Sequence, residues 1–576
     1  MLSLPFSKLA DVYEALEGTR SGLAMRDILS RFFKATPKGD IDKIAYLTLG
    51  RIGPEYEEIE LGMAEKMVLR AIAVAFERGE DEVRREFKKK GDAGLVAEAL
   101  AGRGRDALTV SQVFDKLWEI QAATGPGSQE RKIKILAEML RAAFPKEARY
   151  LTRIALGTLR LGTGTMTVLD SLAIAFTGTK ANKPKLEHAY NICSDIGAVA
   201  RAVATKGLAG VVRFDVIVGR PIKMMLAQRV PSIAEIKEKI PGAIAIEEKY
   251  DGERIQVHKK GREVVLYSRR QENITHQFPD VVAAVLKQIS ARECVIEGEA
   301  VAIKAEDVLL PFQVLMQRRR KYEIERYVKQ IPVCLYLFDL LYLNGRSYIN
   351  RPYLERRAAL RRITRDSPHL KLARNIVTEK VEEIEEFFNE ALNRGCEGIL
   401  AKSTAPDSVY QAGTRGWLWI KWKREYAKEI RETFDLVIIG AFMGRGIRSG
   451  TYGALLAAVY NPKSDRFESF CKVGSGFTEE QLFELPKKLA RYRIPRPSPR
   501  VWIEKAMEPD VHFDPKIVIE VLGAEITKSP THTAAREHFK DAGLALRFPR
   551  FLNYRPDKGP EDATTTEEII RMYSRR

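Results

Sequence analysis

The sequence predicts a chain of three regions with different fold classes: an all-helical region, a mixed α/β region with antiparallel sheet, and a small β-barrel. The chain has 576 residues, more than the roughly 250–300 that one hydrophobic core supports. Apolar residues recur three and four apart as far as about residue 219, and short alternating runs then replace them. We therefore expect domains at 1–219, 220–430 and 431–576.

The first region has the helical period throughout, as in MAEKMVLRAIAVAFERG at 63–79. Between two apolar helical segments, Gly162 and Gly164 follow Arg160 closely in a turn. Glycine lets backbone amides approach a phosphate chain, and arginine adds positive charge. The same pattern also suits a plain turn between two helices, so both interpretations stay open.

The middle region begins with three alternating runs, AIAIEEK, RIQVHKK and EVVLYSR, which predict a three-strand meander over 243–269. CVIEGEAVAI and VCLYLFDLLYL predict further strands. KVEEIEEFFNEALNRG predicts a helix that ends at Gly395.

In the last region, FDLVIIGAF, YGALLAAVY and FESFCKV predict spaced strands with Gly-rich turns, as in a small barrel. A charged helical tail is expected after them.

Composition favours an intracellular protein with a polyanionic partner. Lys and Arg number 95 against 77 Asp and Glu, a net charge of +18. The five cysteines are widely spaced, without a metal-binding pair, so neither zinc nor a disulfide framework is expected. An uncharged apolar run of the roughly 18 residues that span a membrane is absent. We expect a cytoplasmic location and no membrane partner.

EEKYDGER at 247–254 places Lys249 just before an Asp-Gly turn and Arg254 just after it. A lysine amine in water has a pKa of about 10.4, so a nucleophilic lysine needs neighbouring cations or a metal ion. Arg254 could serve as that cation and as a phosphate clamp, although a K-x-D-G sequence alone is more often a turn.

Other charged groups follow in strands. Glu297 and Glu299 are two apart, and therefore on one strand face, and Glu397 precedes a strand that carries Lys402. Such carboxylates suit Mg²⁺, a hard cation that bridges phosphates. In WLWIKWKREY at 417–426, two lysines share one face, where an anion between them would relieve their repulsion; a solvated edge strand is the alternative.

Taken together, these motifs resemble the ATP-dependent DNA ligases, in particular their archaeal and eukaryotic replicative type. EEKYDGER is similar to the family's K-x-D-G-x-R motif. The further matches, in the family's order, are YSRRQENITHQFPD, VIEGEAVAI, FDLLYLNG, CEGILAKS, WIKWK and RFPRFLNYRPDKGPEDATT. The helical segments 153–173 and 189–197 resemble the DNA-binding domain of this branch.

The resemblance implies a helical DNA-binding domain, a nucleotidyltransferase (adenylation) domain with antiparallel sheets, and an OB-fold domain with a helical tail. It implies nick sealing in replication, repair and recombination through a lysyl-AMP intermediate, with ATP and Mg²⁺ as cofactors and Mn²⁺ as the alternative metal. The site residues that it implies are Lys249 as the nucleophile; Glu247, Arg254, Arg269, Glu299, Phe338, Arg415, Lys421 and Lys423 for ATP; Glu299 and Glu397 for the metal; Arg555, Asp557 and Lys558 for the leaving pyrophosphate; and Arg160, Gly162 and Gly164 for DNA.

Nicked duplex DNA is the expected partner, bound by a monomer in the cytoplasm at the nucleoid. A mobile linker is expected near 429–432. The nearest likeness to a sliding-clamp box, RDILSRFF at 26–33, has Arg26 where glutamine is usual, so a core helix is favoured and clamp binding stays open. His512 stands where the family often has tryptophan.

Four alternatives remain. A capping-type guanylyltransferase or an RNA ligase shares the lysine motif, but the long helical region and the PEDATT tail of this chain do not resemble those groups. The NAD-dependent ligases normally carry a four-cysteine zinc site, which this sequence lacks. A non-enzymatic DNA-binding scaffold would explain charge and helices but not the grouped lysines and glutamates.

Overall fold

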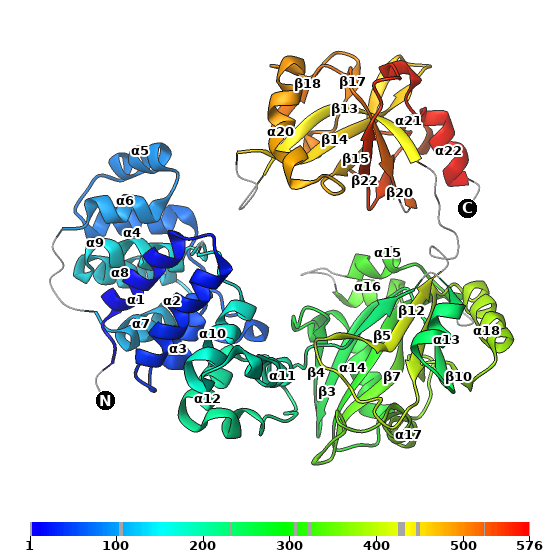
Figure 1. The fold of residues 1–576 in the computed structure, drawn as a ribbon, viewed down its shortest axis with the longest axis horizontal. Coiled ribbons are helices and arrows are strands. Elements are labelled where there is room, and N and C mark those ends of the chain that lie inside the picture. The colour runs from blue at the N-terminus through cyan, green and yellow to red at the C-terminus, as the bar shows by residue number, and fades with distance from the viewer. Residues whose placement is uncertain are drawn as a thin grey trace. The chain divides into compact units, whose positions relative to one another are not determined.

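The computed structural model divides the chain into two compact units, Met1–Lys423 and Arg424–Arg576 (Figure 1). Each unit is described by itself. The structure describes residues 3–102, 108–159, 161–230, 232–304, 308–318, 324–423, 433–444, 450–523 and 525–574. The linker predicted near 429–432 lies outside these residues.

The first part of unit one is helical, as predicted. Its helices surround one apolar core, and the amphipathic period explains them: in α4, for example, Val68, Leu69 and Ile72 are buried. Ser, Asp and Thr side chains cap several N-termini, including Thr109 in the capping box of α7. The helices are α1 Phe6–Glu17, α2 Gly22–Ala35, α3 Ile41–Thr48, α4 Glu65–Ala75, α5 Glu80–Lys90, α6 Ala93–Leu100, α7 Val110–Ala122, α8 Ser128–Ala142, α9 Pro145–Ala155, α10 Thr165–Thr177, α11 Lys183–Cys193 and α12 Ile196–Val211.

The segment that faintly resembles a clamp-binding box belongs to α2. Leu29 and Phe33 are buried in the helical core, and Arg26 forms an ion pair with Asp170 at 3.1 Å. The segment is thus part of the core, as the sequence favoured.

The second part of unit one contains two sheets. One has the order β1-β12-β11-β2-β10, and the other has the order β4-β3-β5-β7-β8, with β6 on β5 and β9 on β7. Helix α18 packs on β2 and β11, and α17 packs on β7. The strands are β1 Leu226–Arg229, β2 Ile244–Lys249, β3 Glu253–Lys260, β4 Glu263–Ser268, β5 Glu293–Lys304, β6 Val308–Leu309, β7 Val333–Leu343, β8 Arg346–Ser347, β9 Leu370–Leu372, β10 Asn375–Thr378, β11 Gly398–Ser403 and β12 Arg415–Lys423; the helices are α13 Ile233–Lys239, α14 Pro279–Gln288, α15 Phe312–Leu315, α16 Ile324–Gln330, α17 Tyr353–Ile363 and α18 Val381–Asn393.

The predicted three-strand meander over 243–269 is wrong in its first pairing. β3 and β4 pair as expected, but β2 pairs with β10 and β11 in the other sheet. The chain therefore changes sheets at Tyr250–Gly252. The reason is packing: Tyr250 is buried and stacks on Tyr336 of β7 with ring centroids 4.2 Å apart, so the connection is held across the core rather than folded into a hairpin.

Unit two contains the OB-like sheets predicted for the last region. The sheet path is β16-β18-β13-β14-β15-β17, with β19 joining β13 to β22, and β20 pairs with β21. Helices α20 and α22 flank the strands (Figure 1). The elements are β13 Thr433–Met443, β14 Tyr452–Asn461, β15 Arg466–Val473, α20 Glu479–Leu489, β16 Arg493–Ile494, β17 Val501–Trp502, β18 Val511–Phe513, β19 Val518–Leu522, β20 Glu525–Ser529, α21 Arg536–Phe539, β21 Gly543–Arg547, β22 Arg550–Tyr554 and α22 Thr566–Ser574.

The five cysteines are free and buried. Over the described residues, none of the helices combines the length and the apolarity that crossing a membrane requires.

Candidate functional site

A pocket of about 530 Å³ lies between the two sheets of unit one. β2, β11 and β12 contribute one wall, and β3, β5 and β7 contribute the other. All ten residues that the sequence assigned to the nucleotide or its metal ion line this pocket. They are Glu247, Lys249, Arg254, Arg269, Glu299, Phe338, Glu397, Arg415, Lys421 and Lys423.

The register of three strands explains why the lysines meet. β11 lies between β2 and β12, and its first residue, Gly398, is opposite Lys249 on one side and Lys423 on the other. The preceding Glu397 therefore reaches both amines: its Oε2 accepts from Lys249 Nζ, and Lys423 Nζ lies 2.8 Å away. Burial alone would raise the pKa of Glu397, but the two lysines lower it, so the carboxylate stays charged.

Two glycines make this approach possible. A Cβ at Gly398 would lie 2.2 Å from the carbonyl oxygen of Trp422, and its φ of +150° suits glycine alone. A Cβ at Gly252 would lie 2.3 Å from the carbonyl oxygen of Ala300 on β5. Both positions therefore need glycine for close strand contact, independently of catalysis.

The other cations gather on the same side. On β12, Trp419, Lys421 and Lys423 face the pocket, whereas Trp422 stacks on Phe388 of α18 at 4.0 Å. Burial, followed by repulsion from Lys249 and Lys423, lowers the pKa of Lys421, and Arg415 and Arg269 contribute as well. The charge pattern is that of a site built for phosphates.

Arg254 is held by Glu297, which the sequence suggested as a possible Mg²⁺ ligand, and by the backbone of Met225. Its Nη2 donates to Glu297 Oε2 at 2.7 Å, and its Nη1 donates to the carbonyl oxygen of Met225 at 2.7 Å. Glu297 is fully buried and also accepts from Gln256 and Tyr410. It therefore orients Arg254, and only its neighbour Glu299 reaches the pocket.

Glu299 and Glu397 are carboxylates of this pocket that could hold a cation. Burial raises the pKa of Glu299 to about 7, against the opposing charges of Lys249 and Arg254, and repulsion from Glu397 adds to the rise. Among the described residues, no three His, Cys, Asp or Glu side chains form a metal cluster. Two carboxylates fit Mg²⁺, which is commonly held by one or two carboxylates together with substrate phosphates.

At the other end of the pocket, Glu247 is paired with Lys402, a residue noted in the sequence without a role. Lys402 Nζ lies 2.6 Å from Glu247 Oε2, and the Lys402 side chain is fully buried. Phe338 and Trp419 form an edge-to-face pair beside them. The sequence feature that could have identified Lys402 is a lysine within a largely apolar strand, because a buried lysine needs a charged partner.

The motif near the C-terminus is organised by an aspartate that the sequence did not single out. Asp435, on β13, accepts from Arg555 Nη1 at 3.0 Å and from Lys558 Nζ at 2.6 Å. Arg555 also donates to Asp557, at 3.0 Å and 2.8 Å. The three predicted residues thus form one ion-pair cluster within unit two.

For the predicted DNA contacts, Arg160 lies outside the described residues. Gly162 has a φ of +69°, and Gly164 is the N-cap of α10 with no atom within 4 Å of a Cβ placed there. The backbone amides of the first turn of α10 therefore follow an unobstructed glycine, a geometry that suits phosphate.

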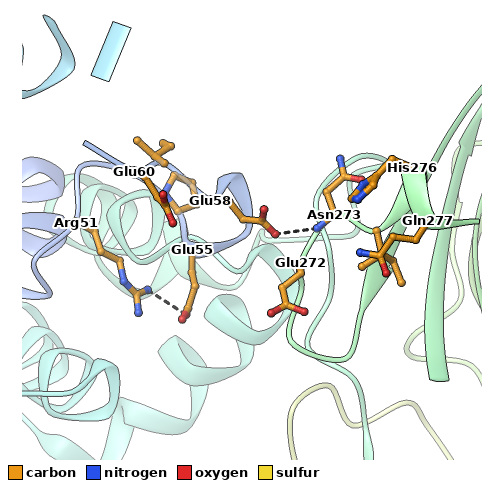
Figure 2. Close-up of a pocket in the computed structure, with 12 residues that line it drawn as sticks. Arg51, Glu55, Glu58, Glu60, Glu272, Asn273, His276 and Gln277 are labelled. Carbon is orange, nitrogen blue, oxygen red and sulfur yellow. Dashed lines mark hydrogen bonds and ion pairs between the residues drawn. The ribbon is translucent and has the colours of Figure 1, made fainter. Parts of the chain in front are cut away.

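A second pocket, of about 640 Å³, has the opposite character. Figure 2 shows Glu55, Glu58, Glu60 and Glu272 around it, with Arg51 paired to Glu55 and the backbone N–H of Asn273 donating to Glu58. Its carboxylates disfavour phosphate, so the pocket between the sheets is the nucleotide candidate.

Three family models match the chain: "DNA ligase N terminus" over 5–173, "ATP dependent DNA ligase domain" over 224–423 and "ATP dependent DNA ligase C terminal region" over 448–558. The chain is 49% identical to "DNA ligase 2" of Thermofilum pendens, over 99% of this chain and 97% of that protein. It is 47% identical to "DNA ligase 1" of Methanosarcina acetivorans, over 98% of each. A solved structure titled "Pmar-Lig_Pre." has a similar fold at a TM-score of 0.54 and 17% identity, over 95% of this chain and 99% of that one. With these matches and the pocket together, the chain belongs to the family of ATP-dependent DNA ligases.

Proposed function

We propose that this chain seals nicks in duplex DNA in three steps, with Lys249 as the residue that carries AMP. The observation that carries the proposal is the pocket itself, where the Lys249 amine meets a charged carboxylate and a group of cations. Joining a 5′-phosphate to a 3′-hydroxyl requires a leaving group on the phosphate, and transferred AMP provides one.

In the first step, the Lys249 amine attacks the α-phosphorus of ATP, the new N–P bond forms, and pyrophosphate leaves. Lys421, Lys423, Arg415 and Arg269 would neutralise charge on the phosphates. Such fixed cations act strongly because they need no rearrangement when charge develops. Glu397 holds the amine in place before ATP arrives.

Glu299 and Glu397 would hold Mg²⁺, or Mn²⁺ in its place, whose contribution is to neutralise phosphate charge. On the base side, Phe338 would stack on adenine and Glu247 would accept from its amino group. Arg254, fixed by Glu297, would contact the ribose.

AMP then passes from Lys249 to the 5′-phosphate, and the 3′-hydroxyl attacks in line with AMP as the leaving group. We assign Arg555, Asp557 and Lys558 to pyrophosphate orientation in the first step. The domains proposed are 1–219, 220–430 and 431–576, acting in a monomer. Arg160, Gly162 and Gly164 would contact the DNA backbone.

The test uses freshly purified protein with Mg²⁺ and ATP labelled at the α-phosphate. We expect acid-labile label on the wild type, chased by nicked duplex DNA into a sealed strand. Lys249→Ala should give no label, whereas Lys380→Ala, which changes an exposed lysine, should label normally.

Two outcomes contradict the proposal. Equal labelling of Lys249→Ala would remove the assigned nucleophile. Label that is chased by nicked RNA but not by nicked duplex DNA would assign the chain to RNA joining instead.

A further inference from the structure

Lys402 contacts both groups that would recognise the adenine base. Its Nζ lies 2.6 Å from Glu247 Oε2 and 4.8 Å from the centre of the Phe338 ring. Its distances to the Trp419 and Tyr353 ring centres are 4.3 Å and 4.9 Å. The amine therefore sits inside an aromatic cage, with a carboxylate as its counterion.

Burying a lysine in this way is costly unless the charge is paired and held by aromatic rings. Lys402 and Glu247 are 0% and 2% exposed, so neither side chain can turn away to solvent. Removing Glu247 would leave the Lys402 charge buried without its carboxylate, and removing Lys402 would leave Glu247 with the more distant Arg357, 3.9 Å away. The pair is therefore fixed in one arrangement.

The remaining contacts of Glu247 leave it as an acceptor. Its Oε1 accepts from the Tyr353 hydroxyl at 2.5 Å, and Arg357 Nη1 lies 3.9 Å from the same oxygen. An ionised carboxylate has about four acceptor sites and no donor. Glu247 lines the pocket, so the free acceptor sites can receive a hydrogen bond from a ligand.

Resting on the function proposed above, we propose that Lys402 is a positioning residue for base selection. It holds the Glu247 carboxylate in one orientation, and it supports the Phe338 ring from the same point. The pocket then accepts a purine that has an exocyclic amino donor facing Glu247. It rejects a purine with a carbonyl oxygen there, because two acceptors would oppose each other.

The test removes the same interaction from the ligand and from the protein. Purine riboside 5′-triphosphate lacks only the amino group of ATP, and the mass of the intact protein reports which nucleotide becomes attached. We expect the wild type to react with ATP about 10- to 100-fold more efficiently, the range for a hydrogen bond to a charged group. Lys402→Met should bring this ratio to within about threefold, chiefly by slowing ATP.

The matched control is Lys259→Met, an identical change at a buried lysine on β3 that donates to the carbonyl oxygen of Ile289 and lies outside the pocket. It should keep the wild-type ratio, even if it lowers the melting temperature. If Lys402→Met does not fold, Lys402→Gln keeps a donor without the charge and should give an intermediate ratio.

Two results would overturn the proposal. One is a wild-type enzyme that uses both triphosphates equally, which needs no variant to observe. The other is a Lys402 variant that slows both triphosphates equally, which would make the residue purely structural. Absence of any adduct with ATP in the wild type would instead contradict the proposed function.

Discussion

Lys423 Nζ lies 2.8 Å from Glu397 Oε2, the same oxygen that accepts from Lys249. One carboxylate thus holds two amines that would otherwise repel each other, from the two strands that flank β11. The arrangement brings the proposed nucleophile and a proposed phosphate-binding cation to one oxygen, and it makes Glu397 the most informative acidic residue to change.

Glu397→Gln should therefore slow lysyl-AMP formation by roughly two orders of magnitude, the scale of losing one electrostatic group from a catalytic site. Without the charge, Lys249 and Lys423 lose their common partner and the metal loses a ligand. Single-turnover transfer of labelled AMP measures the effect. Glu383→Gln, which changes an exposed glutamate of α18, serves as control; equal loss in both variants would contradict the assignment.

Lysyl-AMP formation should need more Mg²⁺ as the pH falls below about 7. The raised pKa of Glu299, about 7, means that its carboxyl is protonated in that range, and a protonated carboxyl does not bind a metal. The Mg²⁺ concentration that gives half-maximal lysyl-AMP formation should rise by up to about tenfold for each pH unit below 7.

Because this pKa is raised on folding, the contribution of Glu299 to stability decreases as the pH rises from the ordinary carboxyl range through about 7.

The control for the Mg²⁺ titration is Glu299→Gln, measured beside the wild type, because ATP also titrates. A midpoint that varies with pH equally in both proteins would show that the nucleotide, and not Glu299, is responsible.

Asp435→Asn should impair the first step selectively. Arg555 and Lys558 both depend on this aspartate, and losing one charge-assisted hydrogen bond predicts about a tenfold slower lysyl-AMP formation. Sealing of a nick that already carries AMP should stay near the wild-type rate. Asp465→Asn, which removes one of the acidic partners of Arg500 in the same unit and leaves Glu561 in place, is the control. Equal slowing of both reactions would argue for a general folding defect.

Gly164→Glu should weaken DNA binding about tenfold at low salt while lysyl-AMP formation is unchanged. A carboxylate at the N-cap of α10 would repel phosphate, and no atom lies within 4 Å of a Cβ placed at Gly164. Gly79→Glu is a close match, since Gly79 is the N-cap of α5 and is equally unobstructed. Similar affinity losses in the two variants would place the DNA elsewhere.

Sequence patterns predicted the features that depend on local period and motif. The alternation within 417–426 placed Lys421 and Lys423 on one face, and the structure agrees. Strand pairing was not predictable, because AIAIEEK has the same pattern whether it pairs with the next strand or crosses to another sheet.

The residue roles that sequence reasoning missed depend on partners that are distant in the sequence. Asp435 meets Arg555 across 120 positions, and Lys402 meets Glu247 across 155. In both cases the partner is chosen by tertiary packing, which a single sequence does not record. Glu297 was noted as a possible ligand, but its full burial makes it a support for Arg254.

Because the chain changes sheets at Tyr250–Gly252, the length of this short connection fixes the position of one sheet relative to the other. Lys249 and Arg254 stand on opposite walls, and the number of residues between them sets how far one wall can slide past the other. A one-residue insertion would be absorbed by most surface turns. Here it would displace Lys249 from Arg254 and Glu299 on the opposite wall, so this connection should tolerate changes of side chain better than changes of length.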